Sequence, residues 1–359
     1  MSFVKDNKAF DKWLAAHCTV VKPDIKYKHH RMEKSAFVFL RATYFRWARK
    51  IGDWCPELMD APRVRAVGDL HLENFGTWRD RDGRLVWGVN DFDEAAVMPY
   101  VLDLVRLVTS IQLATDRPRA INDKAAANAV LEGYRDGLKQ PQPALLFEGE
   151  TWLRPYAEPG EGKPEKFWKE VDGYKKATPP RAIRKALIAS LPGRIDDVRM
   201  CKRTKGGGSL GRQRFVAVGF WRGGHVLREA KALVPSAWLW ANGRVGKHKP
   251  VFLKMANGRY RAPDPFLDIQ KNFIIRRIAA DSEKIDLGVD AGAKLQLRFL
   301  HAMGFDLASI HADTANSVRK IKADLARRPR GWLNAAAAVA ATAVREDYLE
   351  WKRYRKRHR

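Results

Sequence analysis

The sequence predicts an α+β fold in which a small antiparallel sheet accompanies a larger, mostly helical part. Apolar runs at residues 215–221 and 226–233 flank a Gly-Gly pair, a pattern typical of two antiparallel strands joined by a turn. Elsewhere, apolar residues recur at helical spacing, as they do within residues 33–51. A chain of 359 residues can bury one large core or two lobes.

The first 140 residues are expected to combine helices with short strands. Strands are expected at residues 63–67 and 85–89, with an Asp-Gly turn at residues 80–83 between them. This hairpin-like return would bring the segment after the first strand close to Asp91. The segment 101–114 is apolar nearly all round, which predicts a buried helix. The helices expected here cover residues 7–20, 33–51, 101–114 and 121–138.

The second half of the chain changes in character. Residues 139–182 are rich in Pro, Gly and charge and are predicted to form a long surface segment. Residues 266–280 fit a helix or a strand equally well. Helices are expected over residues 182–191, 293–313 and 332–351.

Composition limits the compartment and the partners. Three distant cysteines, Cys18, Cys55 and Cys201, argue against a disulfide framework or a zinc site and favour a reducing, cytoplasmic location. The sequence turns polar directly after Met1, so no signal peptide is expected. No apolar run reaches the roughly 18 residues that span a bilayer, so no membrane partner is expected.

The net charge of +26 attracts polyanions in general, including nucleotides and nucleic acid. The basic residues are dispersed and accompany no nucleic-acid-binding motif. We interpret them mainly as a solvated surface, with non-specific nucleic-acid association as the alternative.

Two acidic segments carry the strongest chemical signal. Residues 68–76 (Gly-Asp-Leu-His-Leu-Glu-Asn-Phe-Gly), called here the Asp69 loop, place Asp69 and Asn74 at the D-x-x-x-x-N spacing of a kinase catalytic loop. Asp69 would orient an acceptor hydroxyl and take its proton, while Asn74 and Asp91 would hold magnesium. Asp93 stands where a D-F-G element has glycine. The simpler alternative is a turn aspartate at residue 69 and a helix cap at residue 91.

A second signal is the glycine loop, defined as residues 206–211. A dinucleotide-binding loop opens a helix, whereas this one precedes a predicted strand, which disfavours a Rossmann site. A glycine loop between strands is the arrangement with which protein kinases cover ATP phosphates. Lys231, on the neighbouring predicted strand, would contact the phosphates. A flexible surface turn is the alternative. The predicted nucleotide-binding residues are Gly206, Gly208, Ser209, Gly211 and Lys231.

Together these segments resemble the DUF2252 family of uncharacterised bacterial proteins. The resemblance spans about residues 30–315, and the family is regarded as related to the protein-kinase-like and aminoglycoside-phosphotransferase-like fold. It therefore implies a kinase-like two-lobe fold, and the Asp69 loop itself resembles the catalytic loop of those small-molecule kinases. The segments that carry the resemblance are residues 34–41, 68–76, 90–95, 103–110, 229–236 and 264–267.

The order of these parts predicts a circular permutation. In a kinase the glycine loop and its lysine come first, followed by a helix ending in Leu-Ala-x-x-His and then the catalytic loop. Here that helix pattern falls at residues 307–311, near the chain end. We expect residues 1–195 and 289–359 to form the helical catalytic lobe and residues 196–288 the nucleotide lobe.

The acidic partner of Lys231 is left open by the sequence. Between Lys231 and residue 300 the only glutamate is Glu283, whereas Glu229 shares the strand and the face of Lys231. Another acid, or the nucleotide itself, is the remaining alternative.

The function expected from these residues is an ATP- and Mg²⁺-dependent phosphotransferase acting on the hydroxyl of a small molecule. Transfer of AMP is compatible with the same residues. One alternative is a metal-dependent phosphodiesterase or nuclease that uses Asp69, His71, Asp91 and Asp93 in a two-metal site. The other is a module that binds nucleotide or RNA without turnover.

Overall fold

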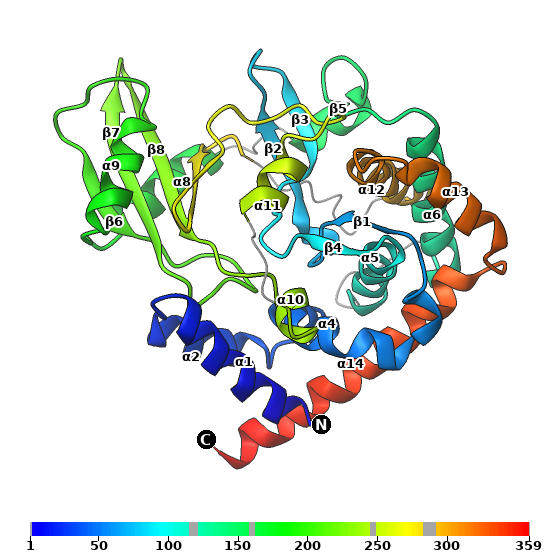
Figure 1. The fold of residues 1–359 in the computed structure, drawn as a ribbon. Helices are drawn as coiled ribbons and strands as arrows, with labels where there is room; N and C mark the ends of the chain where they lie inside the picture. The colour runs from blue at the N-terminus through cyan, green and yellow to red at the C-terminus, as the bar shows by residue number, and fades with distance from the viewer. Residues whose placement is uncertain (1, 115–120, 158–161, 245–248, 283–291, 359) are drawn as a thin grey trace.

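The computed structural model describes residues 2–114, 121–157, 162–244, 249–282 and 292–358 (Figure 1). These residues form fourteen α-helices and three antiparallel sheets of two, five and three strands. This mixture of helices and small antiparallel sheets confirms the predicted α+β class. Glu283 and the expected boundary between residues 288 and 289 lie outside the described residues.

The largest sheet has the strand order β6-β7-β8-β10-β9. The predicted hairpin is confirmed, because β7 pairs with β8 from Arg214 opposite Lys231 to Trp221 opposite Gly224. The ambiguous segment 266–280 contains strands and no helix. The strands are β6 (Arg199–Lys202), β7 (Arg214–Trp221), β8 (Gly224–Ala232), β9 (Asp268–Gln270) and β10 (Phe273–Ile278).

Two helices cover the two faces of this sheet and complete what we call the sheet part (Figure 1). Helix α9 (Arg181–Ala189) packs Ile183 and Leu187 against residues such as Phe215 and Ile275. On the other face, Val171 of α8 (Lys163–Asp172) joins a separate cluster. The predicted surface segment 139–182 therefore contains a packed helix, whose amphipathic pattern is hidden in sequence by the surrounding charge and proline.

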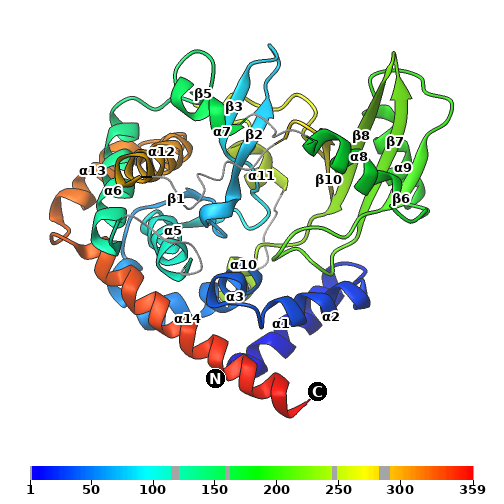
Figure 2. The same ribbon diagram turned by 180° about the vertical axis from the view of Figure 1, so that it is seen from behind.

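The helical part has its own, larger core. Every residue of α5 is buried, which confirms the expected buried helix. Figure 2 shows α14 running beneath α5 and α6, with the two chain ends near each other. The helices of this part are α5 (Val101–Leu113), α6 (Asp123–Lys139), α12 (Ala293–Ala312), α13 (Ser317–Arg327) and α14 (Trp332–Arg357).

Two smaller sheets position the Asp69 loop. Because β2 pairs with β3 from Phe75 opposite Val89, Asn74 lies beside the segment that carries Asp91. The expected return of the chain toward Asp91 is thus confirmed. The strand that pairs with β3 is β2, however, whereas the strand expected at residues 63–67 pairs with residues 96–99 instead. The strands are β1 (Arg63–Ala66) paired with β4 (Ala96–Pro99), and β2 (Phe75–Arg79), β3 (Leu85–Val89) and β5 (Ala144–Leu145).

The N-terminal helices flank the sheet part and the Asp69 loop. The helix expected over residues 33–51 is two helices that meet at Thr43, whose hydroxyl donates to the carbonyl of Phe39. Helix α2 lies in a basic segment where no helix was predicted. These helices are α1 (Phe3–His17), α2 (Lys22–Arg31), α3 (Ala36–Ala42) and α4 (Tyr44–Trp54).

The remaining elements are short and connect these parts. The α-helices among them are α7 (Arg154–Ala157), α10 (Ala237–Ala241) and α11 (Lys249–Ala256). The 3₁₀-helices are η1 (Pro56–Leu58), η2 (Leu72–Asn74) and η3 (Thr151–Leu153). Within the described ranges, no helix combines the length and the apolar character that crossing a membrane requires.

Helices α6 and α12 are in close contact at two glycine positions. A Cβ atom on Gly304 would clash with the backbone oxygen of Val130, and one on Gly133 would clash with that of His301. The close contact of these two helices therefore depends on the absence of side chains at both positions.

We expect Gly304→Ala to lower the free energy of unfolding by about 1–3 kcal/mol, because the added methyl overpacks the helix contact. Chemical denaturation would measure the change. The control is Gly52→Ala in α4, where a Cβ meets only ordinary contacts with Met59 and alanine has the higher helix propensity. Equal stability of Gly304→Ala and Gly52→Ala would contradict the close packing.

Candidate functional site

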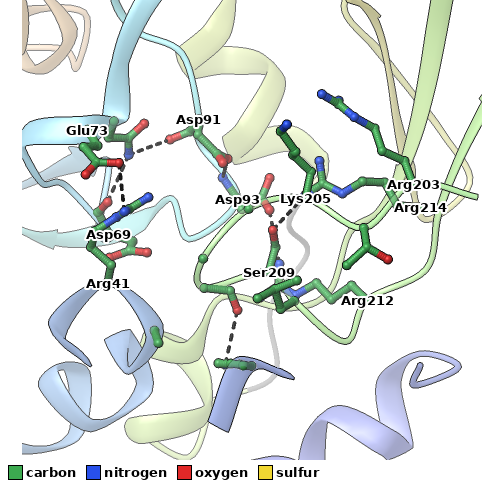
Figure 3. Close-up of a pocket in the computed structure, with 18 of the residues that line it drawn as sticks. Arg41, Asp69, Glu73, Asp91, Asp93, Arg203, Lys205, Ser209, Arg212 and Arg214 are labelled. Atoms are coloured by element: carbon green, nitrogen blue, oxygen red, sulfur yellow. Dashed lines mark hydrogen bonds and ion pairs between the residues drawn. The ribbon is translucent and has the colours of Figure 1, made fainter. Parts of the chain in front are cut away.

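A cavity of about 880 Å³ lies between the sheet part, the Asp69 loop and helices α2 and α3 (Figure 3). Two predicted site residues, Gly211 and Lys231, lie outside its lining: the Gly211 carbonyl accepts from Val21 N, and Lys231 is buried below the surface. The predicted site residues that line it are Asp69, Asn74, Asp91, Gly206, Gly208 and Ser209.

Asp103 fixes the backbone that carries Asp69. Its carboxylate, on buried helix α5, accepts hydrogen bonds from Val67 N at 2.7 Å and Gly68 N at 2.9 Å. His311 Nε2 on α12 lies 3.1 Å from the same carboxylate. Asp103 therefore holds the backbone of the Asp69 loop to helix α5.

Arg106, one turn further along α5, pairs with the Asp69 side chain. Its Nε donates to Asp69 Oδ1 at 3.1 Å, and its Nη2 contacts the same oxygen. The guanidinium is fully buried over the rings of Tyr44 and Trp47. Arg106 therefore pairs with the Asp69 side chain and not with Asp103, its neighbour on the same helix.

The pKa of Asp69 is raised. Burial of the carboxylate is the main cause, and the neighbouring Arg106 and Arg41 guanidinium groups oppose it. A carboxylate that takes a proton more readily than an ordinary aspartate is suited to act as a general base near neutral pH. Its Oδ2 faces the glycine loop, since a Cβ on Gly208 would lie 3.3 Å away.

Asn74 and Asp91 present oxygen atoms to the cavity. The Asn74 amide donates to the carbonyl oxygens of Asp69 at 2.9 Å and Asp91 at 3.3 Å, which fixes its orientation. Its Oδ1 is buried and has no hydrogen-bond partner among the described residues. The Asp91 side chain is 42% exposed. A buried oxygen left unpaired next to a carboxylate fits a hard cation such as Mg²⁺.

The described part of the chain contains no group of three or more His, Cys, Asp and Glu side chains placed to hold a metal. This does not conflict with Mg²⁺, which proteins commonly bind with one or two carboxylates together with substrate phosphates.

Lys231 pairs with aspartates. Its Nζ lies 3.1 Å from Asp91 Oδ2 and also contacts Asp93, and the side chain is 2% exposed. Burial alone would raise the pKa of Asp91, but the Lys231 ammonium and a hydrogen bond with Asp93 hold that pKa well below its usual range. The acidic partner left open by the sequence is therefore this aspartate pair.

Glu229 is surrounded by arginines. The carboxylate is fully buried and contacts Arg203, Arg214 and Arg276, with ion-pair distances of 2.6, 3.0 and 2.8 Å. Strand register explains this cluster, because Arg276 lies opposite Glu229 on β10 and Arg214 lies opposite Lys231 on β7. All three arginines also line the cavity and give its sheet side a positive charge.

Further ion pairs at the cavity were not anticipated from the sequence. Arg212 contacts Asp93 at 3.2 Å and Glu94 at 2.8 Å, and Arg41 contacts Glu73 at 2.8 Å. Arg106 offered a usable signal, since a charged residue on an otherwise apolar helix requires a buried partner. The partners of Arg41 and Arg212 lie far away in sequence and left no local pattern.

Residues 21–145 match the model of a family described as an uncharacterized protein conserved in bacteria (DUF2252). This range includes the Asp69 loop and the segment 90–95, so the match supports the part of the resemblance that these two segments carry. The segments 229–236 and 264–267 lie outside the match. No curated protein and no solved structure matches the chain.

We expect Glu229→Gln to lower the free energy of unfolding at pH 7 by about 3–5 kcal/mol, because three arginines lose their shared counter-charge. Burial would raise the pKa of Glu229, but Arg214, Arg276 and Arg203 hold it well below its usual range. This stabilisation is present above the pKa of an unfolded glutamate, about 4.3, and is lost as pH falls toward the folded pKa.

The difference in stability between wild type and Glu229→Gln should therefore shrink below about pH 4. Urea denaturation across pH values would measure it. Glu132→Gln, at an exposed position of α6, is the control and should change stability by less than about 0.5 kcal/mol. A pH-independent difference would contradict a low pKa for Glu229.

Proposed function

We propose that this protein is an ATP- and Mg²⁺-dependent phosphotransferase of kinase-like fold that acts on the hydroxyl of a small molecule. One observation supports this most strongly. Lys231, in the sheet part, forms an ion pair with Asp91, which lies next to the Asp69 loop. The two residues are 140 positions apart in the sequence. A predicted base, two predicted metal ligands and the glycine loop consequently share one cavity.

The spatial arrangement also supports a circularly permuted order. The pattern at residues 307–311 ends in His311, which contacts Asp103 beneath the Asp69 loop. A helix that precedes the catalytic loop in a kinase chain thus lies beside that loop in space. The first helix also lies against the last one, since Phe3 N donates to Glu350 Oε2 at 3.2 Å, and a permuted order is tolerated where such segments are neighbours.

The residues have distinct roles in the proposed reaction. Asp69, oriented by Arg106, accepts the proton of the acceptor hydroxyl. Asn74 Oδ1 and Asp91 would hold Mg²⁺, which supplies positive charge against the phosphate oxygens of ATP. Lys231 keeps Asp91 ionised and fixed. Arg203 and Arg276 offer further positive charge on the sheet side, where the triphosphate would lie.

The nuclease alternative has less support. His71 Nδ1 accepts from Glu73 N, so that nitrogen serves the loop backbone. Asp93 is engaged by both Lys231 and Arg212. Transfer of AMP uses the same groups as transfer of phosphate, and the reaction product distinguishes the two.

We also propose a cytoplasmic location, supported by the free state of Cys18, Cys55 and Cys201.

We expect ATP with Mg²⁺ to stabilise the wild-type protein by about 2.7 kcal/mol at a hundred times the dissociation constant. Thermal denaturation with and without the nucleotide measures this. Asp91→Asn should lose most of the Mg²⁺-dependent stabilisation, whereas Asp69→Asn should retain it. Turnover in Asp69→Asn should fall by about 10²–10⁴-fold, because the general base is absent.

Asp60→Asn, an exposed position outside the cavity, is the matched control for both aspartate variants. No nucleotide-dependent shift in the wild-type protein would exclude the proposal. A shift without ATP turnover in the wild type would favour the binding module instead.

The rate of turnover should fall on the acid side at a pH above the ordinary aspartate range, near 3.9. The reason is that Asp69 must be ionised to act as a base, and burial raises its pKa despite Arg106. A pH profile of kcat with ATP and Mg²⁺ at saturation measures this. A rate that stayed constant down to pH 4 would argue against Asp69 as the base.

A further inference from the structure

Helix α2 places two cations on the glycine loop. Lys28 Nζ donates to the carbonyl of Gly208 at 3.2 Å, and Arg31 Nη1 donates to that of Gly206 at 3.0 Å. The start of α2 is tied to the same loop, because Val21 N donates to Gly211 O at 2.8 Å. The proposed function gives these two side chains no role.

Neither cation forms an ion pair within the described residues, where the polar contacts of both end on carbonyl oxygens. The carboxylates of Asp11, Glu94 and Asp69 act on Lys28 only from a greater distance, and their effect is smaller than that of burial. Lys28 is only 3% exposed, and burial lowers its pKa. A carbonyl oxygen carries only a partial charge, so it offsets little of the cost of burying an ammonium group. An anionic ligand would supply the direct ion-pair partner that these two side chains do not have in the fold.

The cations converge near Asp69. Lys28, Arg31 and Arg41 line a water-sized void beside Gly207, and all three also line the main cavity together with Lys34. Gly208 in turn packs against the Arg41 backbone and Asp69. In Figure 3, Arg41 and Asp69 lie on one side of the glycine loop, and Arg203 and Arg214 lie on the other.

We propose that Lys28, Arg31, Lys34 and Arg41 form an anion subsite that binds a phosphate or carboxylate group carried by the acceptor. This inference rests on the proposed function, since it takes the Asp69 side of the loop as the acceptor side. The arginines of the sheet part would then contact the nucleotide. The acceptor class is then a small hydroxyl compound with its own anionic group, held by charge-assisted hydrogen bonds.

Inorganic phosphate is the probe. Its binding to the full chain is measured by calorimetry, with and without a saturating non-hydrolysable ATP analogue and Mg²⁺. We expect the Lys28→Met/Arg31→Gln double variant to bind phosphate at least about tenfold more weakly, and the analogue within about twofold of wild type. Lys26→Met, an exposed lysine of the same helix outside the cavity lining, is the control.

A second variant, Arg31→Gln/Lys34→Gln, avoids the buried position and guards against misfolding. Phosphate binding should persist when the analogue is bound. Displacement of phosphate by the analogue, or equal weakening of both ligands, would assign the cations to the nucleotide and overturn the inference. Undiminished or absent phosphate binding would overturn it as well. Failure of the wild type to bind the analogue, with phosphate binding still lost in the variants, would contradict the proposed function and leave the subsite supported.

Discussion

The buried carboxylate of Asp103 fixes the loop on which the rest of the site depends. It receives two backbone amides from that loop, and His311 lies against it with Tyr134 on the other ring nitrogen at 2.8 Å. Asp103, His311 and Tyr134 are all fully buried. Because a buried carboxylate without donors is very costly, the loop geometry and the packing of α5, α6 and α12 are set together.

Some arginines of this basic chain are internal and paired with acids. Arg106, Arg212 and Arg214 are buried, and each is held by an acid from another segment. Buried ion pairs contribute little net stability compared with apolar packing, but breaking one is expensive, so they enforce a specific arrangement. The interpretation of the basic residues as a solvated surface therefore does not apply to these arginines, of which Arg212 and Arg214 line the cavity.

What could be predicted from the sequence was local. The proximity of Asn74 to Asp91 follows from a hairpin, and the β7–β8 pair follows from alternation around a Gly-Gly turn. The acidic partner of Lys231 depends on how the sheet part meets the Asp69 loop, and no short-range pattern encodes that contact. Helix α2 was missed because its sequence is charged throughout, and its position depends on contacts with a loop encoded about 180 residues later.

The long sequence separations at the site also constrain how the chain folds as it is made. Lys231 follows Asp91 by 140 residues, and His311 follows Asp103 by 208. At a synthesis rate of about 5–20 residues per second, the time between the synthesis of each aspartate and that of its partner is on the order of ten seconds. During that interval the emerging N-terminal half carries ionised groups that it cannot yet bury. The contacts that hold the Asp69 loop and its cavity can therefore form only after the segments that carry Lys231 and His311 have been synthesised.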